Sequence, residues 1–257
     1  MNFLNKHVVV TGGANGIGRC TAGAFLREGA TVTVIDVDRQ AGELLQNRHD
    51  GLCFFHGDIA EKSVLEDFVK SLRRPVDCLI NNACISRAGL LSDCSYVDFE
   101  YVQRVGVTAP YYLTKLLLQN NLLTNNASIV NISSSRSRQS QPDTESYSAA
   151  KGGISALTHS MAISLSGRAR VNSISPGWIE AAACHETAAS PDHSEMDMKQ
   201  HPVRRVGTPE DISELVLYLC GDKAAFINGE DIAVDGGMSR LMIYNNDHGW
   251  SFSTKGC

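Results

Sequence analysis

Short apolar runs alternate with longer amphipathic stretches along most of the chain. The first run, His7 to Val10, is apolar and too short for a helix, so it predicts a buried strand of a parallel sheet. The run from Thr31 to Asp36 is rich in β-branched residues, which favour strands. Further short runs predict strands at 53–56, 77–80, 128–132, 170–174 and 231–234.

In the stretches between these runs, apolar residues recur every three or four positions, as they do on one face of a helix. Gly29 is placed to end the first helix, and Thr208 with Pro209 to begin the last one. Helices are predicted at 17–28, 63–72, 96–121, 143–165 and 209–220. Strands that alternate with helices predict an α/β fold in a single domain, 1–257. We expect a doubly wound, parallel, seven-stranded, Rossmann-like sheet with helices on both faces.

Two segments interrupt this alternation. The segment 178–205 contains Pro191 and Pro202 and follows the carboxyl end of a strand, where ligands bind in open α/β sheets. We interpret it as a substrate lid with His185 as a candidate substrate contact, with an ordinary surface insertion as the alternative. We expect the apolar tail 239–257 to dock on the active-site cleft or on a neighbouring subunit. Its apolar residues include Met242, Ile243, Tyr244, Trp250 and Phe252.

Composition and charge exclude several classes of protein. The net charge is -5 and the basic residues are scattered, which argues against a nucleic-acid partner. No apolar stretch approaches the ~20 residues of a membrane span, and Asn5-Lys6-His7 interrupts any signal peptide, so we expect a cytoplasmic protein with no membrane partner. None of the eight cysteines forms a CxxC pair. We expect mostly buried, reduced thiols rather than a disulfide framework, and no metal centre.

A glycine-rich loop, Thr11-Gly12-Gly13-Ala14-Asn15-Gly16-Ile17-Gly18, joins the first strand to the first helix. Glycines permit a close approach of the backbone, and the helix N-terminus offers free N–H groups and a positive dipole end to a pyrophosphate. Because a strand precedes the loop, a helix follows it and an acid ends the next strand, the pattern predicts a dinucleotide site. The candidate cofactor-binding residues of the loop are Gly12, Asn15, Gly16, Ile17 and Gly18.

Residues at the ends of the next strands extend this site. Asp36 ends the second strand, where a carboxylate accepts both ribose hydroxyls of an adenosine and repels a 2′-phosphate, so we expect NAD rather than NADP. Arg39 lies close enough to complicate this choice, but a residue at a helix start is expected to be solvated. The third and fourth strands are followed by Asp58-Ile59 and Asn82-Ala83, where the adenine and the nicotinamide ribose would lie.

Tyr147 and Lys151 lie four residues apart and therefore on one face of the predicted helix. An ammonium beside a phenol favours the phenolate, and such a phenol can give a proton to a carbonyl oxygen or take one from an alcohol. Because a tyrosine and a lysine at this spacing often occur by chance, the pair indicates catalysis only together with the remaining motifs. Ser134 lies thirteen residues before Tyr147.

These motifs together resemble the short-chain dehydrogenase/reductase family over the whole chain except about the last 15 residues. The matching pieces are TGGANGIG at 11–18, NNA at 81–83, Ser134, YSAAK at 147–151 and SPG at 175–177. The resemblance implies NAD(P)(H)-dependent redox between an alcohol and a carbonyl of a small molecule. It also implies a homotetramer built from the helices at 96–121 and 143–165, although their apolar residues could equally be core.

The resemblance also implies a role for each matching residue. Ser134 would bind the substrate oxygen, Tyr147 would be the general acid and base, and Lys151 would hold the nicotinamide ribose. Pro176, Gly177 and Ile179 would line the nicotinamide carboxamide. Among neighbouring serines, the family spacing selects Ser134, and strand alternation turns Ser133 and Ser135 to the opposite side.

Two residues depart from the family pattern. Cys84 replaces a glycine and forbids an easy positive φ, and Gly106 replaces an asparagine of the catalytic set. In the family, the main-chain carbonyl of that asparagine holds a water that links the lysine to solvent. Glycine keeps the carbonyl, and Pro110 has no N–H to donate to it, so we hypothesise that the relay persists through the backbone. The alternative is an impaired NAD(H)-binding relative with a sensing or structural role.

Polar residues after Ser134 indicate the substrate class. Arg136, Arg138, Gln139 and Gln141 favour a hydroxylated or anionic small molecule, unless the two arginines are solvated loop residues. Trp178 could stack on a substrate ring or simply wall the pocket. A sugar or polyol, a hydroxy acid, a steroid and an acyl-carrier substrate all remain open.

Overall fold

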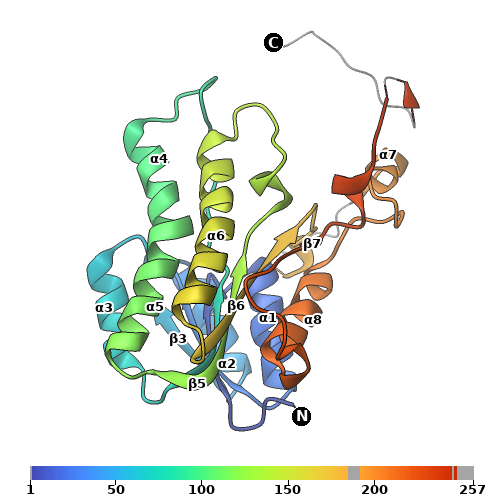
Figure 1. Ribbon diagram of the computed structural model, residues 1–257. Helices are drawn as coiled ribbons and strands as arrows, with labels where there is room; N and C mark the ends of the chain where they lie inside the picture. Colours follow the sequence, from blue (N-terminus) through green and yellow to red (C-terminus); the bar gives the residue numbers. More distant parts are fainter. Residues whose placement is uncertain (1, 185–191, 245, 248–257) are drawn as a thin grey trace.

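The computed structural model describes residues 2–184, 192–244 and 246–247. Within this range seven parallel strands form one sheet in the order β3-β2-β1-β4-β5-β6-β7, which confirms the predicted doubly wound fold (Figure 1). The order reverses between β1 and β4, the kind of switch point where open α/β sheets bind ligands. The strands are β1 (His7–Thr11), β2 (Thr31–Asp36), β3 (Leu52–His56), β4 (Val76–Asn81), β5 (Leu123–Ile132), β6 (Ala169–Pro176) and β7 (Asp231–Val234).

Helices cover both faces of the sheet (Figure 1). They are α1 (Gly16–Arg27), α2 (Arg39–Arg48), α3 (Lys62–Ser71), α4 (Tyr96–Gln103), α5 (Ala109–Gln119), α6 (Glu145–Ser164), α7 (Glu195–Lys199) and α8 (Pro209–Cys220). Successive residues of a strand point to opposite faces. Val8 and Val10 accordingly pack with α1, α2 and α8, whereas Val9 packs with α3, α5 and α6. The two faces therefore have separate apolar cores.

The long helix predicted at 96–121 is interrupted. A π-helical turn, Arg104–Thr108, separates α4 from α5, and the Ala109 N–H donates to the Arg104 carbonyl five residues earlier. Pro110 has no N–H and cannot complete the regular i→i−4 pattern, which is the physical reason for a break at this point. The prediction of one continuous helix over 96–121 is therefore wrong at this π-turn.

Several predicted element ends are also present. Gly29 adopts φ +88° directly after α1, and the side chains of Thr208 and Asp211 form a capping box at the start of α8. The predicted strand at 128–132 is too short, because β5 begins at Leu123. Its first half runs through Thr124, Asn125 and Asn126, which carry no apolar signal, and its register against β4 shifts there.

The predicted lid and tail are described in part. The lid contains a 3₁₀ turn, Ala182–Cys184, and the helix α7, while His185 and Pro191 lie outside the described residues. In the tail, Met242 and Tyr244 are largely exposed, and Trp250 and Phe252 lie outside the described residues. Docking of the tail stays a prediction.

The structure also bears on two further expectations, the absence of a membrane span and the burial of the cysteines. None of the helices in the described part of the chain is both long and apolar enough to cross a membrane. The seven described cysteines have free thiols, but only Cys78 is fully buried and Cys53 and Cys84 are exposed. The prediction that most cysteines are buried is therefore wrong, because an apolar run can still turn single side chains to the surface, as the edge strand β3 does with Cys53.

Candidate active site

A cavity of about 390 Å³ lies at the carboxyl edge of the sheet, where β1, β2, β3 and β4 end. Most of the predicted cofactor-binding residues line it: Gly12, Asn15, Gly16, Ile17, Asp36, Asp58, Ile59, Asn82 and Ala83. The structure therefore brings the glycine-rich loop and the strand ends together in one cavity, as expected.

The glycine-rich loop is held by close backbone contacts. Gly12 has φ +63°, and a Cβ on it would lie 2.7 Å from the Ala83 Cα. A Cβ on Gly18 would lie 2.1 Å from the Gly12 carbonyl oxygen, so Gly18 allows the loop to pack on α1 rather than lining the cavity. The Asn82 side chain donates to the carbonyl oxygens of Thr11 (3.1 Å) and Gly12 (2.8 Å). This amide ties the loop to the end of β4.

The N-terminus of α1 has no side-chain cap. Asn15 occupies the N-cap position, but its side-chain amide donates to Asp38 (2.9 Å) instead of capping the helix. The first backbone N–H groups of α1 are therefore not satisfied by this side chain, and they carry the positive end of the helix dipole. An anion beside Gly16 and Ile17 in the cavity would find these donors.

Asp36 lies at the rim of the cavity and organises the turn after β2. One carboxylate oxygen accepts from the Ala14 N–H (2.9 Å) and the other from the Asp38 N–H (3.0 Å). The nearby Arg39 is occupied elsewhere, with Nη1 3.4 Å from the Glu43 carboxylate and Nη2 3.1 Å from the His56 ring nitrogen. Arg39 does not line the cavity among the residues described.

The side of the cavity near Asp58 contains residues that no sequence motif predicts. Tyr101 of α4 donates its hydroxyl to the Asp58 carboxylate (2.8 Å), and burial, followed by this hydrogen bond, raises the pKa of Tyr101. Further lining residues that were not predicted are Val37, Cys84, Ile85, Val105 and Ala181. They are apolar or small and come from loops and a helix, so no motif signals them. The φ of Cys84 is not positive, so the cysteine is compatible with this turn.

Ser134 and its neighbour Ser133 follow β5 with opposite orientations, as predicted. Ser133 Oγ donates to the Lys151 carbonyl (3.0 Å) and lies 2.8 Å from Ser155 Oγ, so it faces α6 and serves packing. Ser134 is buried in extended backbone, and its Oγ accepts from the Arg136 N–H (3.1 Å). The Ser134 hydroxyl hydrogen is thereby left for another acceptor.

Tyr147 and Lys151 lie one turn apart on α6, as predicted. Lys151 is 3% exposed, and its Nζ donates to the Ile132 carbonyl (2.7 Å) at the end of β5. The same Nζ lies 5.4 Å from the centre of the Tyr147 ring, and the guanidinium carbon of Arg136 lies 5.8 Å from that centre. Two cationic side chains thus lie on the ring of one phenol.

Gly106 lies against the helix that carries this pair. A Cβ on Gly106 would lie 2.8 Å from the Ala150 Cβ, closer than side chains pack. Ala150 directly precedes Lys151 in α6. Glycine at this position in the π-turn therefore lets α6 approach the turn closely.

The residues after β6 occupy different surroundings. Pro176 ends β6, and the Gly177 N–H donates to the Val234 carbonyl (3.0 Å). Ile179 lines a second cavity of about 220 Å³ together with Trp178 and His201. None of Pro176, Gly177 and Ile179 lines the larger cavity in the part of the chain described, so their contact with a nicotinamide stays a prediction.

The two arginines after Ser134 differ in their partners. Arg138 forms an ion pair with Asp231 (3.2 Å), and this carboxylate also accepts from the hydroxyls of Ser173 (2.9 Å) and Ser175 (2.7 Å). Arg136 lies over Tyr147 and donates to the Gln141 side chain. Of the two, Arg136 is the one positioned beside the predicted reactive phenol.

Comparisons with known proteins agree with this arrangement. A protein-family profile described as enoyl-(acyl carrier protein) reductase matches residues 12–239. An uncharacterised oxidoreductase of Thermotoga maritima is 40% identical over 250 residues, which are 93% of this chain and 98% of that protein. The 2-(S)-hydroxypropyl-CoM dehydrogenase 3 of Xanthobacter autotrophicus is 33% identical, over 92% of this chain and 98% of that protein. The structure of an apo SCOR enzyme from Clostridium thermocellum is 42% identical and superposes with a TM-score of 0.88, over 97% of this chain and 99% of that one.

Proposed function

The chain belongs to the short-chain dehydrogenase/reductase family, whose members are oxidoreductases acting on CH–OH groups with a nicotinamide cofactor, and we propose that it interconverts a secondary alcohol and a ketone with NAD(H). The observation that carries the proposal is the cavity at the carboxyl edge of the sheet, lined by the glycine-rich loop, Asp36 and Asn82-Ala83. This cavity fits a dinucleotide, because Cβ atoms are absent where the loop is tightest and the N-terminus of α1 is uncapped. A nicotinamide cofactor, when bound, supplies the hydride acceptor or donor.

The surroundings of Asp36 support NAD over NADP. Its carboxylate would accept the ribose hydroxyls and would repel a 2′-phosphate. An arginine free to bind that phosphate would favour NADP, but Arg39 is engaged by Glu43 and His56. Asp58 and Ile59 would hold the adenine, with Tyr101 fixing the Asp58 carboxylate.

The proposed chemistry uses three side chains. Ser134 donates its hydroxyl hydrogen to the substrate oxygen, and Tyr147 gives a proton to that oxygen in reduction or takes it in oxidation. Lys151 holds the nicotinamide ribose, and its ammonium lies beside the Tyr147 ring. Its 2.7 Å hydrogen bond to the Ile132 carbonyl supports this role, because it fixes the ammonium below the phenol.

Gly106 serves the proton relay through its main chain. Pro110 has no N–H, so the carbonyl of Gly106 lacks its ordinary helical donor and is left for a water near Lys151. The π-turn at this point supports the proposal, since such turns are frequent at functional sites. Close packing of Gly106 against Ala150 of α6 is a second physical reason for glycine at this position.

The substrate we propose is a small, polar, hydroxylated or anionic molecule. Arg136 supports this class, because its guanidinium lies beside the Tyr147 ring, where it can bind a hydroxyl or a carboxylate next to the reacting carbon. The lid would close over the substrate from Trp178 onward.

We also propose a homo-oligomer, a dimer or a tetramer, that acts in the cytoplasm. Exposed apolar side chains on the helices α4 and α6 support the assembly, with Tyr96 81%, Val97 65% and Ile163 78% exposed. Light scattering should give a dimer or tetramer mass for the protein and a smaller mass for Val97→Asp. A monomer at high protein concentration would refute the assembly and leave the catalytic proposal intact.

The test of the proposed function is nicotinamide absorbance with a panel of polyols, hydroxy acids and hydroxysteroids, each with NAD and with NADP. We expect turnover with NAD at kcat/KM at least about tenfold above NADP, since one carboxylate facing a phosphate is worth about 1–3 kcal/mol. Asp36→Ala should reduce this preference, and Tyr147→Phe should abolish turnover while NADH still binds.

Two outcomes would contradict the proposal. Preference for NADP in the unaltered protein would refute the role of Asp36. NADH binding without turnover across the whole panel would instead support the alternative, a catalytically impaired NAD(H)-binding protein with a sensing or structural role. That alternative is suggested by Gly106 in place of the usual asparagine.

A further inference from the structure

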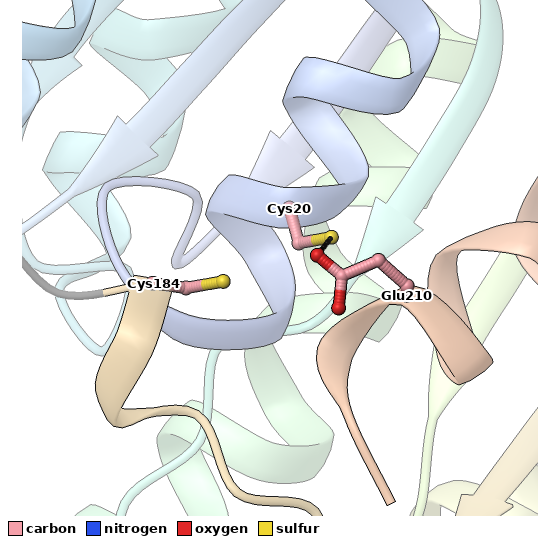
Figure 2. Close-up of side chains that lie close together, drawn as sticks. All are labelled: Cys20, Cys184 and Glu210. Carbon is pink, nitrogen blue, oxygen red and sulfur yellow. Dashed lines mark hydrogen bonds between the residues drawn. The ribbon is translucent and has the colours of Figure 1, made fainter. Parts of the chain in front are cut away.

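Three potential metal ligands meet outside the catalytic residues. Cys20 lies on α1, Cys184 ends the 3₁₀ turn of the lid, and Glu210 lies in the first turn of α8 (Figure 2). The two sulfur atoms and a carboxylate oxygen all lie within 4.8 Å of one another. Each residue comes from a different element, so the fold rather than a sequence motif creates this cluster.

The spacing matches a tetrahedral ion. With Zn–S near 2.3 Å and Zn–O near 2.1 Å, a tetrahedral zinc holds a sulfur and an oxygen about 3.6 Å apart and two sulfurs about 3.8 Å apart. Cys20 Sγ lies 3.4 Å from Glu210 Oε1, and the remaining pairs satisfy the 4.8 Å limit. Ser213 Oγ lies 3.5 Å from Cys20 Sγ, where it can fix the thiol orientation.

The burial of the cluster suits an ion that enters from solvent. Cys20 and Cys184 are half-buried and Glu210 is exposed, so the carboxylate lies on the open side.

We propose that Cys20, Cys184 and Glu210 bind one Zn²⁺ ion, with water as the fourth ligand. Thiolates with a carboxylate select zinc over magnesium or calcium, which prefer oxygen ligands alone. The two thiols each release one proton to solvent on binding, and no electron is transferred. This assignment departs from the expectation of no metal centre, because the three residues are far apart in the sequence.

The ion would fasten the described residues 181–184 at the rim of the cofactor cavity. Ala181 lines that cavity and lies three residues before Cys184. A zinc held by Cys184 from the lid and by Cys20 and Glu210 from two helices would restrain this segment. This consequence for the lid rests on the proposed function, whereas metal binding does not.

The test is titration of the full-length protein with Co²⁺ after treatment with a chelator and a phosphine reductant, followed by Zn²⁺. We expect one Co²⁺ per chain with a thiolate-to-cobalt charge-transfer band, and displacement of the band by Zn²⁺. Cys20→Ser and Cys184→Ser should each lose the band and weaken Zn²⁺ binding at least about tenfold. Cys53→Ser is the matched control, since Cys53 is exposed on β3, and it should keep the band.

Several outcomes would overturn the site. These are the absence of a thiolate band, full Zn²⁺ affinity in both cysteine variants, loss of the band in Cys53→Ser, and a Cys20–Cys184 disulfide in place of metal binding under the same conditions. Cys184 lies outside the sheet and the helices packed on it, so Cys184→Ser keeps the test valid if Cys20→Ser misfolds. Tyr147→Phe should bind Zn²⁺ normally, which separates failure of the site from failure of the proposed function.

Discussion

Adding one methyl group at Gly106 should separate the π-turn from α6. The new Cβ of Gly106→Ala would lie 2.8 Å from the Ala150 Cβ, whereas ordinary contact begins at 3.4 Å. Overpacking of this kind costs about 1–3 kcal/mol, and replacing a helical glycine by alanine returns about 1 kcal/mol. We therefore expect Gly106→Ala to lower the free energy of unfolding by up to about 2 kcal/mol.

A double-mutant cycle isolates this contact. In Ala150→Gly the opposing methyl group is gone, so Gly106→Ala should there raise the free energy of unfolding by up to about 1 kcal/mol. The coupling energy between the two positions should therefore be about 1–3 kcal/mol. Urea denaturation of the four proteins measures it. A coupling energy within error of zero would show that the contact does not determine the residue at 106.

The same pair tests the backbone relay. In the Ala150→Gly background, Gly106→Asn supplies the usual asparagine without the clash, and we expect turnover within about tenfold of Ala150→Gly alone. A rise of several orders of magnitude would show that the relay through the main chain of Gly106 is broken in the native protein.

Two further predictions concern Asn82 and His7. Asn82→Ala removes the amide that donates to the Gly12 carbonyl, so it should lower the free energy of unfolding by about 1–3 kcal/mol. It should also raise the KM for NAD. Asn47→Ala, on the exposed face of α2, is the control. Burial lowers the pKa of His7 below 6.5. As the pH falls through 6.5 the unfolded chain therefore binds a proton first, and the folded state loses stability down to the lowered pKa. Urea midpoints at about pH 7 and about pH 5 should differ less in His7→Gln than in the native protein. An equal difference would contradict the assignment of His7.

The fold could be predicted because its signals are local. Each strand of the sheet centre is a short apolar run with a turn at its carboxyl end, and the glycine-rich loop, Asp36 and Asn82 mark three of those ends. Parallel strands place these ends at one edge, so the cavity follows from the order of the elements. The missing N–H of Pro110 was likewise readable, since it is a property of one residue, although the π-turn before it was not predicted.

The rest depends on contacts between distant elements. Tyr101 lines the cavity and its hydroxyl donates to Asp58, which is 43 residues away in the sequence, so nothing in its own neighbourhood indicates this role. Half of β5 was missed because Asn125 and Asn126 carry no apolar side chains and lie where the register against β4 is irregular, between Leu123 and Ser128. The apolar pattern also set no bounds for α2, whose buried residues are few.

The packing of α1 against α8 has a consequence for biosynthesis. The apolar face of α1, including Phe25, is covered by Ile212 and Val216, and the bond from Cys20 to Glu210 spans 190 residues. At about 5–20 residues per second, a ribosome needs about 10–40 s between making these two helices. During that time the nucleotide-binding half exposes an uncovered apolar surface. The nascent chain is then a substrate for chaperones, and any truncation before α8 leaves that surface permanently open.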